Sequence, residues 1–244
     1  MTNSSNLIDS LEVYVLNNPD DVKPHWVSHF IVPTANELLI KIKNKNGNSG
    51  FGLATSYSDI SPIIKPFSNG LQDFIIGQDP FCPEKIYESI SKLTDTRISS
   101  EKGWNKEALI RISAALDIAC WDLMGKSSNI PLYKLFGGYR NKIPVYVTCG
   151  YYREGKTETE LKEELTKLIE IGHQSFKVKV GGLTIKEDAK RLEIIRDVIG
   201  QDKALMIDVN RAWDLKTAIE GVEEFKKFNP AWIEEPLRWE DDRR

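Results

Sequence analysis

The sequence predicts an α+β region at residues 1–140 followed by an α/β region at residues 141–244. Two observations lead to this fold class. In the first region, strand-like runs joined by a turn precede amphipathic helices. In the second, short apolar strands alternate with longer helices, and the strands recur at intervals of about 27 to 31 residues, the length of one β/α unit.

The strand-like runs of the first region are Leu11 to Leu16 and Glu37 to Lys43. Asn46-Gly47 and a further short run, Ser49 to Thr55, follow the second of them. Because Asn-Gly between two such runs is typical of a hairpin, we expect an antiparallel sheet.

Two helices are predicted after this hairpin, at Pro83 to Leu93 and Lys106 to Leu123, and Gly125 is expected to end the second helix. The apolar stripe predicted for the second helix consists of Ala114, Ala115, Ile118, Ala119 and Leu123.

The second region contains four predicted strands with helices between them. The strands are Pro144 to Cys149, Ser175 to Val180, Ala204 to Val209 and Ala231 to Glu234. The helices are Glu158 to Ile171, Ile185 to Ile199 and Leu215 to Phe228. Strand–helix alternation of this kind predicts a parallel sheet.

Four β/α units fit either a doubly wound sheet or a (β/α)₈ barrel that has been cut short. Chemistry in a barrel lies at the C-terminal ends of the strands. The sequence concentrates polar residues at those ends, namely Lys177, Lys179, Asp208, Asn210, Glu234 and Glu235. No GxGxxG turn follows the first strand, which weakens the dinucleotide-binding alternative. We therefore predict a partial TIM-type barrel.

Lys177 and Lys179 stand two positions apart on one strand, so their side chains share a face. A Lys-x-Lys pair on an open strand normally lies in solvent, but both faces of a strand in a β/α unit are covered. Two ammonium groups crowded inside a barrel would depress each other's pKa. One of the lysines could then act as a base.

Asp208 and Glu234 occupy equivalent positions on successive strands, which predicts that they lie side by side at the barrel mouth. Two buried carboxylates cannot both ionise unless a cation sits between them. Oxygen ligands favour Mg²⁺ over Zn²⁺. Either residue alone could instead cap a helix or pair with a lysine.

Four motifs carry a family resemblance: ALDIACWDLMGKSSNIPLYKLFGG at 115–138, FKVKVGG at 176–182, DVNRAWD at 208–214 and WIEEPL at 232–237. Their order and spacing resemble the mandelate racemase and muconate lactonizing enzyme branch of the enolase superfamily. The resemblance implies an N-terminal capping domain at residues 1–140 and the first half of a modified (β/α)₇β barrel at residues 141–244.

The resemblance also implies residue roles. Lys179 resembles the proton-abstracting base, and Lys177 the lysine that holds or polarises the substrate carboxylate. Asp208 and Glu234 resemble two Mg²⁺ ligands. Asn210 resembles the polar residue beside the metal, and Glu235 is expected to support the site without binding the ion.

The capping loops in this family close over the barrel mouth and contact the distal end of the substrate. Segments 17–33 and 50–61 resemble these loops. We expect His25 to contact substrate, although a lone histidine more often packs in a core or on a surface. Asn17, Asn18 and Asp20 suit a hydroxylated ligand.

The implied activity is Mg²⁺-dependent abstraction of a proton alpha to a carboxylate, through an enediolate that the cation stabilises. The residues of these motifs favour a lyase that dehydrates an acid sugar. A racemase or epimerase, and a cycloisomerase of the muconate type, would use the same half site. A non-catalytic fragment is the alternative from a different class.

The family pattern requires a third metal ligand on the next strand, and the sequence ends at Arg244 before reaching it. A half barrel would also leave strand edges unpaired. We therefore expect a truncated chain that lacks the C-terminal half of the barrel, binds Mg²⁺ weakly and has negligible turnover by itself.

The bulk composition argues against several classes of partner. A net charge of -3 argues against nucleic acid. The sequence shows neither a signal peptide nor an apolar run long enough to span a membrane, and its three cysteines lack metal-site spacing. We predict a cytoplasmic enzyme whose partner is a small-molecule carboxylate, a hydroxy acid or sugar acid. Family members commonly assemble as dimers or octamers, which implies a homo-oligomer.

Overall fold

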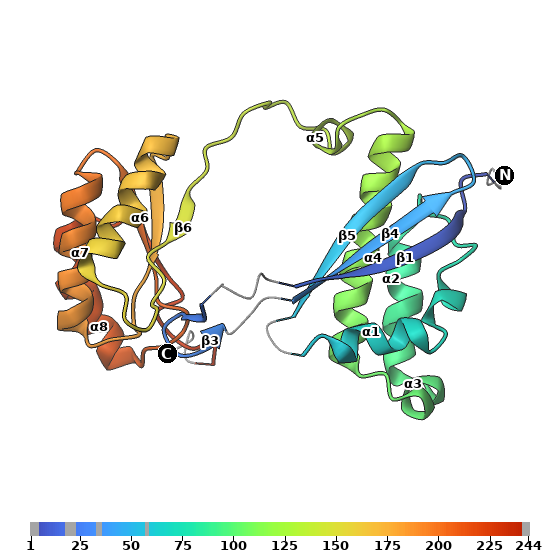
Figure 1. The fold of residues 1–244 in the computed structure, drawn as a ribbon, viewed down its shortest axis with the longest axis horizontal. Helices are drawn as coiled ribbons and strands as arrows, with labels where there is room; N and C mark the ends of the chain where they lie inside the picture. Colours follow the sequence, from blue (N-terminus) through green and yellow to red (C-terminus); the bar gives the residue numbers. More distant parts are fainter. Residues whose placement is uncertain (1–4, 18–22, 33–35, 57–58, 241–244) are drawn as a thin grey trace. The chain divides into compact units, whose positions relative to one another are not determined.

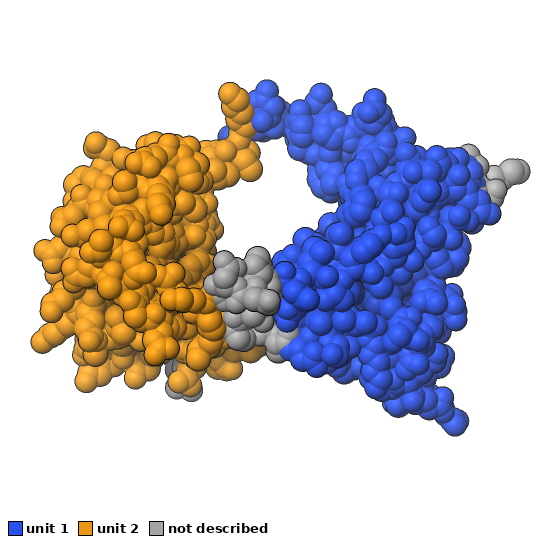
Figure 2. All heavy atoms as spheres, in the orientation of Figure 1, with its two compact units in different colours: residues 1–22, 34–141 blue, residues 23–33, 142–244 orange. Residues whose placement is uncertain are grey.

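The computed structural model describes residues 5–17, 23–32, 36–56 and 59–240, and these form two compact units (Figure 2). Unit 1 is drawn from residues 1–22 and 34–141, and unit 2 from residues 23–33 and 142–244. Unit 1 combines an antiparallel sheet with helices, and unit 2 contains a parallel sheet with intervening helices. The predicted succession of an α+β fold and an α/β fold is therefore confirmed.

The main sheet of unit 1 has the strand order β1-β4-β5 and is antiparallel. The strands are β1 (Ile8–Leu16), β4 (Asn36–Asn44) and β5 (Ser49–Ser56). The predicted turn at Asn46-Gly47 joins β4 to β5, with Gly47 in the left-handed region at φ 87° and its N–H donating to the carbonyl of Asn44. The predicted hairpin is confirmed.

Helices cover one face of this sheet (Figure 1). The helices of unit 1 are α1 (Ser61–Ser68), α2 (Pro83–Lys92), α3 (Arg97–Lys102), α4 (Lys106–Ser127) and α5 (Leu132–Leu135), with short 3-10 turns at Leu71–Phe74 and Leu93–Asp95. Helix α4 lies directly on β5. A Cβ atom on Gly52 would come within 1.9 Å of the Ala115 carbonyl oxygen, so glycine is what permits this close approach.

Helix α4 corrects two expectations. Gly125 does not end it, because the helix continues to Ser127 and only Asn129 adopts a positive φ, at 51°. Gly125 instead leaves room for the chain that returns past the helix, with the Ile130 carbonyl oxygen 3.1 Å from where its Cβ would be. The predicted stripe was also partly wrong, since Ala114 and Ile118 are exposed. The buried face includes Leu109, Ile112, Ala115, Leu116, Ala119, Cys120 and Leu123.

The four strands of the larger sheet in unit 2 are parallel and follow the chain in the order β6-β7-β8-β9. They are β6 (Val147–Cys149), β7 (Ser175–Lys179), β8 (Ala204–Asp208) and β9 (Ile233–Glu234). All four predicted strands are present, each shorter than expected. Residues 144–146 and 231–232 lie outside the strands, although the Ala231 N–H donates to the Leu205 carbonyl of β8 at 2.7 Å.

The helices between these strands are α6 (Glu158–Ile171), α7 (Ile185–Ile199) and α8 (Leu215–Phe225), followed by a 3-10 turn at Lys226–Phe228 (Figure 1). Each helix is preceded by an N-cap residue whose side chain accepts a hydrogen bond from a backbone N–H of the first turn. These residues are Thr157, Thr184 and Asp214. The two threonines form complete capping boxes with Glu160 and Glu187. Residues such as Leu165, Phe176, Leu192 and Leu205 form a core between helices and sheet.

Arg196 of α7 is buried at the edge of unit 2 where strands β8 and β9 begin. Its guanidinium donates to four backbone carbonyls, those of Gly200, Lys203, Phe228 and Asn229, at 2.8–3.0 Å. The first two belong to the loop before β8 and the last two to the loop before β9. One side chain therefore ties two connections together.

A two-stranded hairpin, β2 (His25–Trp26) and β3 (Ile31–Val32), was not predicted as regular structure. It belongs to unit 2, where Trp26 forms an antiparallel bridge with Tyr152. Within the described ranges, the helices lack the combination of length and apolarity that a bilayer crossing requires.

Candidate active site

Strand register aligns the polar residues at the ends of three neighbouring strands. Lys179 on β7 pairs with Asp208 on β8, and Asp208 pairs with Glu234 on β9. Residues paired in register on parallel strands project from the same face of the sheet. Lys177, two residues before Lys179, shares that face. The sequence prediction that these four side chains converge agrees with this geometry.

Lys179 lies among oxygen atoms. Its Nζ is 2.7 Å from Oδ2 of Asp208 and 2.9 Å from Oδ1 of Asn210. The backbone N–H of Asn210 in turn donates to Oδ1 of Asp208 at 3.0 Å. Asp208 is 1% exposed and Lys179 7% exposed, so these charges are paired away from bulk water.

Lys177 bridges the two carboxylates. Its Nζ is 2.8 Å from Oε1 of Glu234 and 3.5 Å from Oδ2 of Asp208. Glu234 remains partly accessible, and its Oε2 also accepts from the indole N–H of Trp232 at 3.2 Å. The two lysines and two carboxylates therefore form one continuous ion-pair cluster.

The expected mutual depression of the lysine pKa values is wrong for Lys177. Burial lowers the pKa of Lys177, but its hydrogen bond to Glu234 and the charges of Asp208 and Glu234 outweigh burial, so the pKa is raised. Sequence reasoning considered the neighbouring ammonium group and neglected the two carboxylates that neutralise it.

The donor atoms around the cluster suit a hard cation. Asp208 and Glu234 supply carboxylate oxygens and Asn210 an amide oxygen, which are the ligands Mg²⁺ takes in proteins. The same oxygens hold the two ammonium groups, so the site already accommodates positive charge. The part of the chain that the structure describes contains no group of three or more His, Cys, Asp or Glu side chains that could hold a metal ion.

The backbone turns sharply where β8 and β9 end. Asn210, Arg211 and Glu235 all have positive φ, at 50°, 64° and 43°. The Arg211 N–H donates to the Glu235 carbonyl at 2.7 Å, and its Nε lies 3.5 Å from a Glu235 carboxylate oxygen. Glu235 is thus paired with Arg211.

His25 and Lys179 both contact the ring of Tyr151. Its imidazole packs edge-on against Tyr151 with ring centroids 4.8 Å apart, and Nζ of Lys179 lies 5.4 Å from the Tyr151 ring. Burial and the charge of Lys156 lower the pKa of His25. Asn17 is exposed. Asn18 and Asp20 lie outside the described residues.

Two tyrosines were missed by sequence reasoning. The Tyr146 ring lies 5.2 Å from Nζ of Lys177, as the Tyr151 ring lies near Lys179. Aromatic faces attract ammonium groups, so the Tyr146 ring favours the charged form of Lys177, whose pKa is raised. Tyr146 was recognisable in principle, because alternation along its strand puts it on the face of Thr148, which pairs with Lys177.

Two family models match the chain. The N-terminal domain model for mandelate racemase and muconate lactonizing enzyme matches residues 10–137. The enolase C-terminal domain-like model matches residues 160–244, which include all four cluster residues.

Individual relatives have several activities. The arabinonate dehydratase of Saccharolobus solfataricus is 30% identical over 82% of this chain and 52% of its own length. The N-succinyl-L-Arg/Lys racemase of Bacillus cereus is 29% identical over 96% of this chain and 60% of its own. The chain thus spans about half to three-fifths of these relatives.

A solved structure shares the fold. The L-talarate/galactarate dehydratase of Salmonella typhimurium, crystallised with Mg and L-lyxarohydroxamate, superposes with a TM-score of 0.81 at 26% identity. The match covers 95% of this chain and 59% of the dehydratase. The parallel sheet of unit 2 therefore corresponds to part of an α/β barrel.

Proposed function

The chain belongs to the mandelate racemase and muconate lactonizing enzyme branch of the enolase superfamily, and we propose that it supplies the metal-binding and proton-abstracting half of an enzyme acting on a carboxylate. One observation carries the proposal: Lys179, Asp208 and Glu234 lie in register across three adjacent parallel strands, with Lys177 bridging the two carboxylates. Residues 1–140 would serve as the capping domain and residues 141–244 as the first half of the barrel.

In this proposal Lys179 removes the proton alpha to the substrate carboxylate. Its Nζ is held by Asp208 and Asn210, which fixes the direction from which it can reach a substrate carbon. Lys177 stays protonated, in keeping with its raised pKa, and its ammonium group attracts the substrate carboxylate.

Asp208 and Glu234, with Asn210 beside them, would hold Mg²⁺ through their oxygen atoms. When bound there, Mg²⁺ supplies electrostatic stabilisation for the negative charge that develops on the substrate carboxylate as the proton leaves. A related dehydratase crystallised with Mg supports this choice of ion.

We propose an acid sugar as substrate and loss of water as the outcome, because sugar-acid dehydratases are among the relatives. Racemisation or epimerisation is the second candidate, since a racemase and two epimerases are also among the relatives. Proton abstraction by Lys179 would be common to both. A cycloisomerase would use the same half site.

The test follows alpha-proton exchange in deuterated water. The full-length gene product, with MgCl₂, is incubated with a panel of aldonates, aldarates and N-acylated amino acids, and deuterium uptake is measured by NMR. Replacing Lys179 by alanine is expected to lower exchange by at least about 10³-fold, because the reaction loses its general base.

A matched control is Lys203→Ala, which removes a lysine bonded to a helix carbonyl on α7, away from the cluster. Full exchange is expected in this control. Formation of a 2-keto acid indicates a dehydratase, and inversion without loss of water indicates a racemase or epimerase. Wild-type exchange in the Lys179→Ala variant would refute the proposed base.

A further inference from the structure

The loop after strand β7 carries Val180, Gly181 and Gly182, which immediately follow Lys179. A buried carboxylate holds this loop in place. Asp188 on α7 is 0% exposed, and its Oδ2 accepts the N–H of Gly181 at 2.7 Å. The proposed base therefore lies close in sequence to a residue that is anchored to the next helix.

Tyr152 completes the anchor from the other side. Its hydroxyl donates to Oδ1 of Asp188 at 2.6 Å and accepts the N–H of Gly182 at 3.1 Å. The loop packs directly on the ring, since a Cβ atom on Gly182 would lie 2.6 Å from a ring carbon. Burial first, and then the nearby Asp188 charge, raises the pKa of Tyr152, which keeps the hydroxyl protonated and able to donate.

The backbone of Tyr152 makes a different set of contacts, to the β2–β3 hairpin. The N–H of Trp26 donates to the Tyr152 carbonyl at 2.9 Å, and the N–H of Tyr152 donates to the Trp26 carbonyl at 3.2 Å. The two rings stack with an interplanar angle of 13° and centroids 6.1 Å apart. Tyr152 thus contacts the hairpin through its backbone and ring, and the loop through its hydroxyl.

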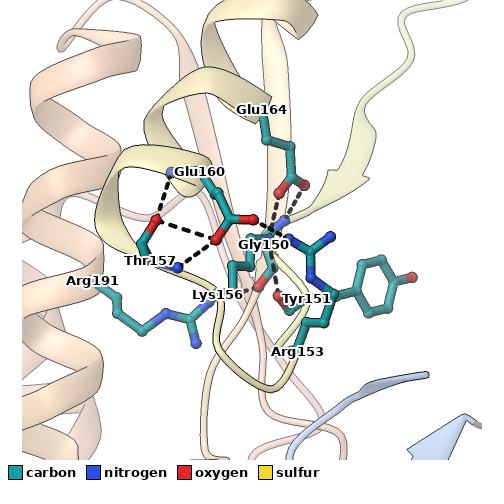
Figure 3. A network of polar contacts seen from close by, with 8 residues as sticks. All are labelled: Gly150, Tyr151, Arg153, Lys156, Thr157, Glu160, Glu164 and Arg191. Carbon is teal, nitrogen blue, oxygen red and sulfur yellow. Dashed lines mark hydrogen bonds and ion pairs between the residues drawn. The ribbon is translucent and has the colours of Figure 1, made fainter. Parts of the chain in front are cut away.

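Polar contacts around Gly150, two residues before Tyr152, hold the segment that carries this tyrosine (Figure 3). The Arg191 guanidinium lies 4.0 Å from the Tyr152 ring and donates to the Gly150 carbonyl at 2.7 Å. Glu164 accepts the Gly150 N–H at 2.9 Å and also pairs with Lys156. The segment that carries Tyr152 is therefore braced by both α6 and α7.

We propose that Tyr152 is a positioning residue that couples docking of the β2–β3 hairpin to the placement of Lys179. The hairpin fixes the Tyr152 backbone, the Tyr152 hydroxyl fixes Asp188 and Gly182, and these fix the loop in which the Lys179 strand ends. The relevance to chemistry rests on the proposed function of Lys179, whereas the coupling is a property of the chain alone.

The coupling is tested by hydrogen exchange in a double-mutant cycle. Trp26→Ala perturbs the hairpin, and Tyr152→Phe removes the hydroxyl while keeping the stacked ring and the backbone bridge. The reporter is the Gly181 amide, which bonds to Asp188 and does not contact Tyr152 directly. Core amides at Leu205 and Ile207 show that each variant is folded.

Trp26→Ala is expected to speed Gly181 exchange about fivefold in the protein that keeps Tyr152, and by less than about twofold in the Tyr152→Phe variant. Ser28 also bonds to the Val180 carbonyl, but this contact is present in both backgrounds and cancels in the comparison. Tyr146→Phe, which removes a hydroxyl from a ring that contacts Lys177 and Trp232 instead, is the matched control and should leave the fivefold response intact.

Equal responses to Trp26→Ala with and without the Tyr152→Phe substitution would overturn the proposal, as would the absence of any response. Because the exchange readout needs no substrate, it is independent of the activity test. Hydrogen exchange at Gly181 could show the coupling even if the full-length product exchanges no alpha proton of any substrate. In that case the role of Tyr152 would hold and the proposed function would be refuted.

Discussion

At the scale of single residues, the candidate site is a balance of charge among Lys177, Lys179, Asp208 and Glu234. Both carboxylates that would bind Mg²⁺ also accept from an ammonium group. Cation binding therefore competes with the lysines for the same side chains. In the proposed enzyme, the two lysines would therefore also weaken the affinity of the site for metal.

Replacing Lys177 by methionine is expected to raise Mg²⁺ affinity by about tenfold. The substitution removes a positive charge that competes with the metal for two partly desolvated carboxylates. Calorimetric titration with MgCl₂ measures the change. Lys203→Met, which removes a lysine outside the cluster, should leave the affinity unchanged. Equal affinities in the Lys177→Met and wild-type proteins would show that the ammonium group does not compete with the metal.

The second prediction at this scale concerns Asp188 and the dependence of folding stability on pH. Burial raises its pKa despite hydrogen bonds from Tyr152 and Gly181. Above the unfolded value of 3.8 and up to the raised folded value, the native state binds more protons than the unfolded state, so stability from this group falls as pH rises. Relative to Asp188→Asn, the wild type should therefore lose stability as the pH rises above 3.8.

Urea unfolding at several pH values tests this difference. Asp197→Asn, an exposed aspartate on the same helix, is the control and should follow the wild-type pH profile. Parallel profiles for Asp188→Asn and wild type would mean that the buried carboxyl does not titrate differently in the folded state.

At the scale of elements, regular patterns were predictable and short or context-dependent features were not. Helix α7 matches its predicted bounds because Thr184 and Gly200 mark its ends in sequence. The β2–β3 hairpin has two residues in each strand, and its register is set by tertiary contact with Tyr152. Gly125 shows the same limit, since the close approach of a returning chain segment, rather than a helix end, explains the glycine there.

The features of the candidate site also divide into those that could be predicted from the sequence and those that could not. The positions of Lys179, Asp208 and Glu234 could be predicted because strand periodicity and β/α spacing fix them. The charge state of Lys177 and the contacts of Tyr146 and Tyr152 could not, because they depend on which side chains meet across strands and loops.

Helix capping gives the element-scale prediction. Thr184→Ala removes the acceptor for the Glu187 N–H and breaks a complete capping box, and is expected to lower the free energy of unfolding of unit 2 by about 1 kcal/mol. Thr166→Ala, in the middle of α6 where the hydroxyl bonds only its own helix, should change it by less than about 0.5 kcal/mol. Chemical denaturation of both variants makes the comparison, and equal effects would contradict the capping role.

At the scale of the whole molecule, the described chain has two separate hydrophobic cores. One contains Leu109 with the helices and sheet of unit 1, and the other contains Leu205 with those of unit 2. Units with their own cores generally retain folding cooperativity of their own. We therefore expect each unit to have its own free energy of unfolding.

Leu109→Ala and Leu205→Ala form the matched pair for this prediction, since both side chains are 0% exposed. Each is expected to cost about 2–5 kcal/mol, from lost burial and the cavity that remains. Hydrogen exchange should accelerate in the unit that carries the substitution and stay at the wild-type rate in the other. Acceleration across both units from either variant would show that they unfold together.

Arg196 has a consequence for how such a protein can diversify. Its four bonds to backbone carbonyls secure the connections at the N-terminal ends of β8 and β9, whereas Asp208 and Glu234 stand at the C-terminal ends of the same strands. In the proposed enzyme, mutations that alter reactivity would fall at one edge of the sheet, and mutations that disturb the framework would fall at the other. Selection can thus change one substrate for another through a few side chains while the scaffold remains intact.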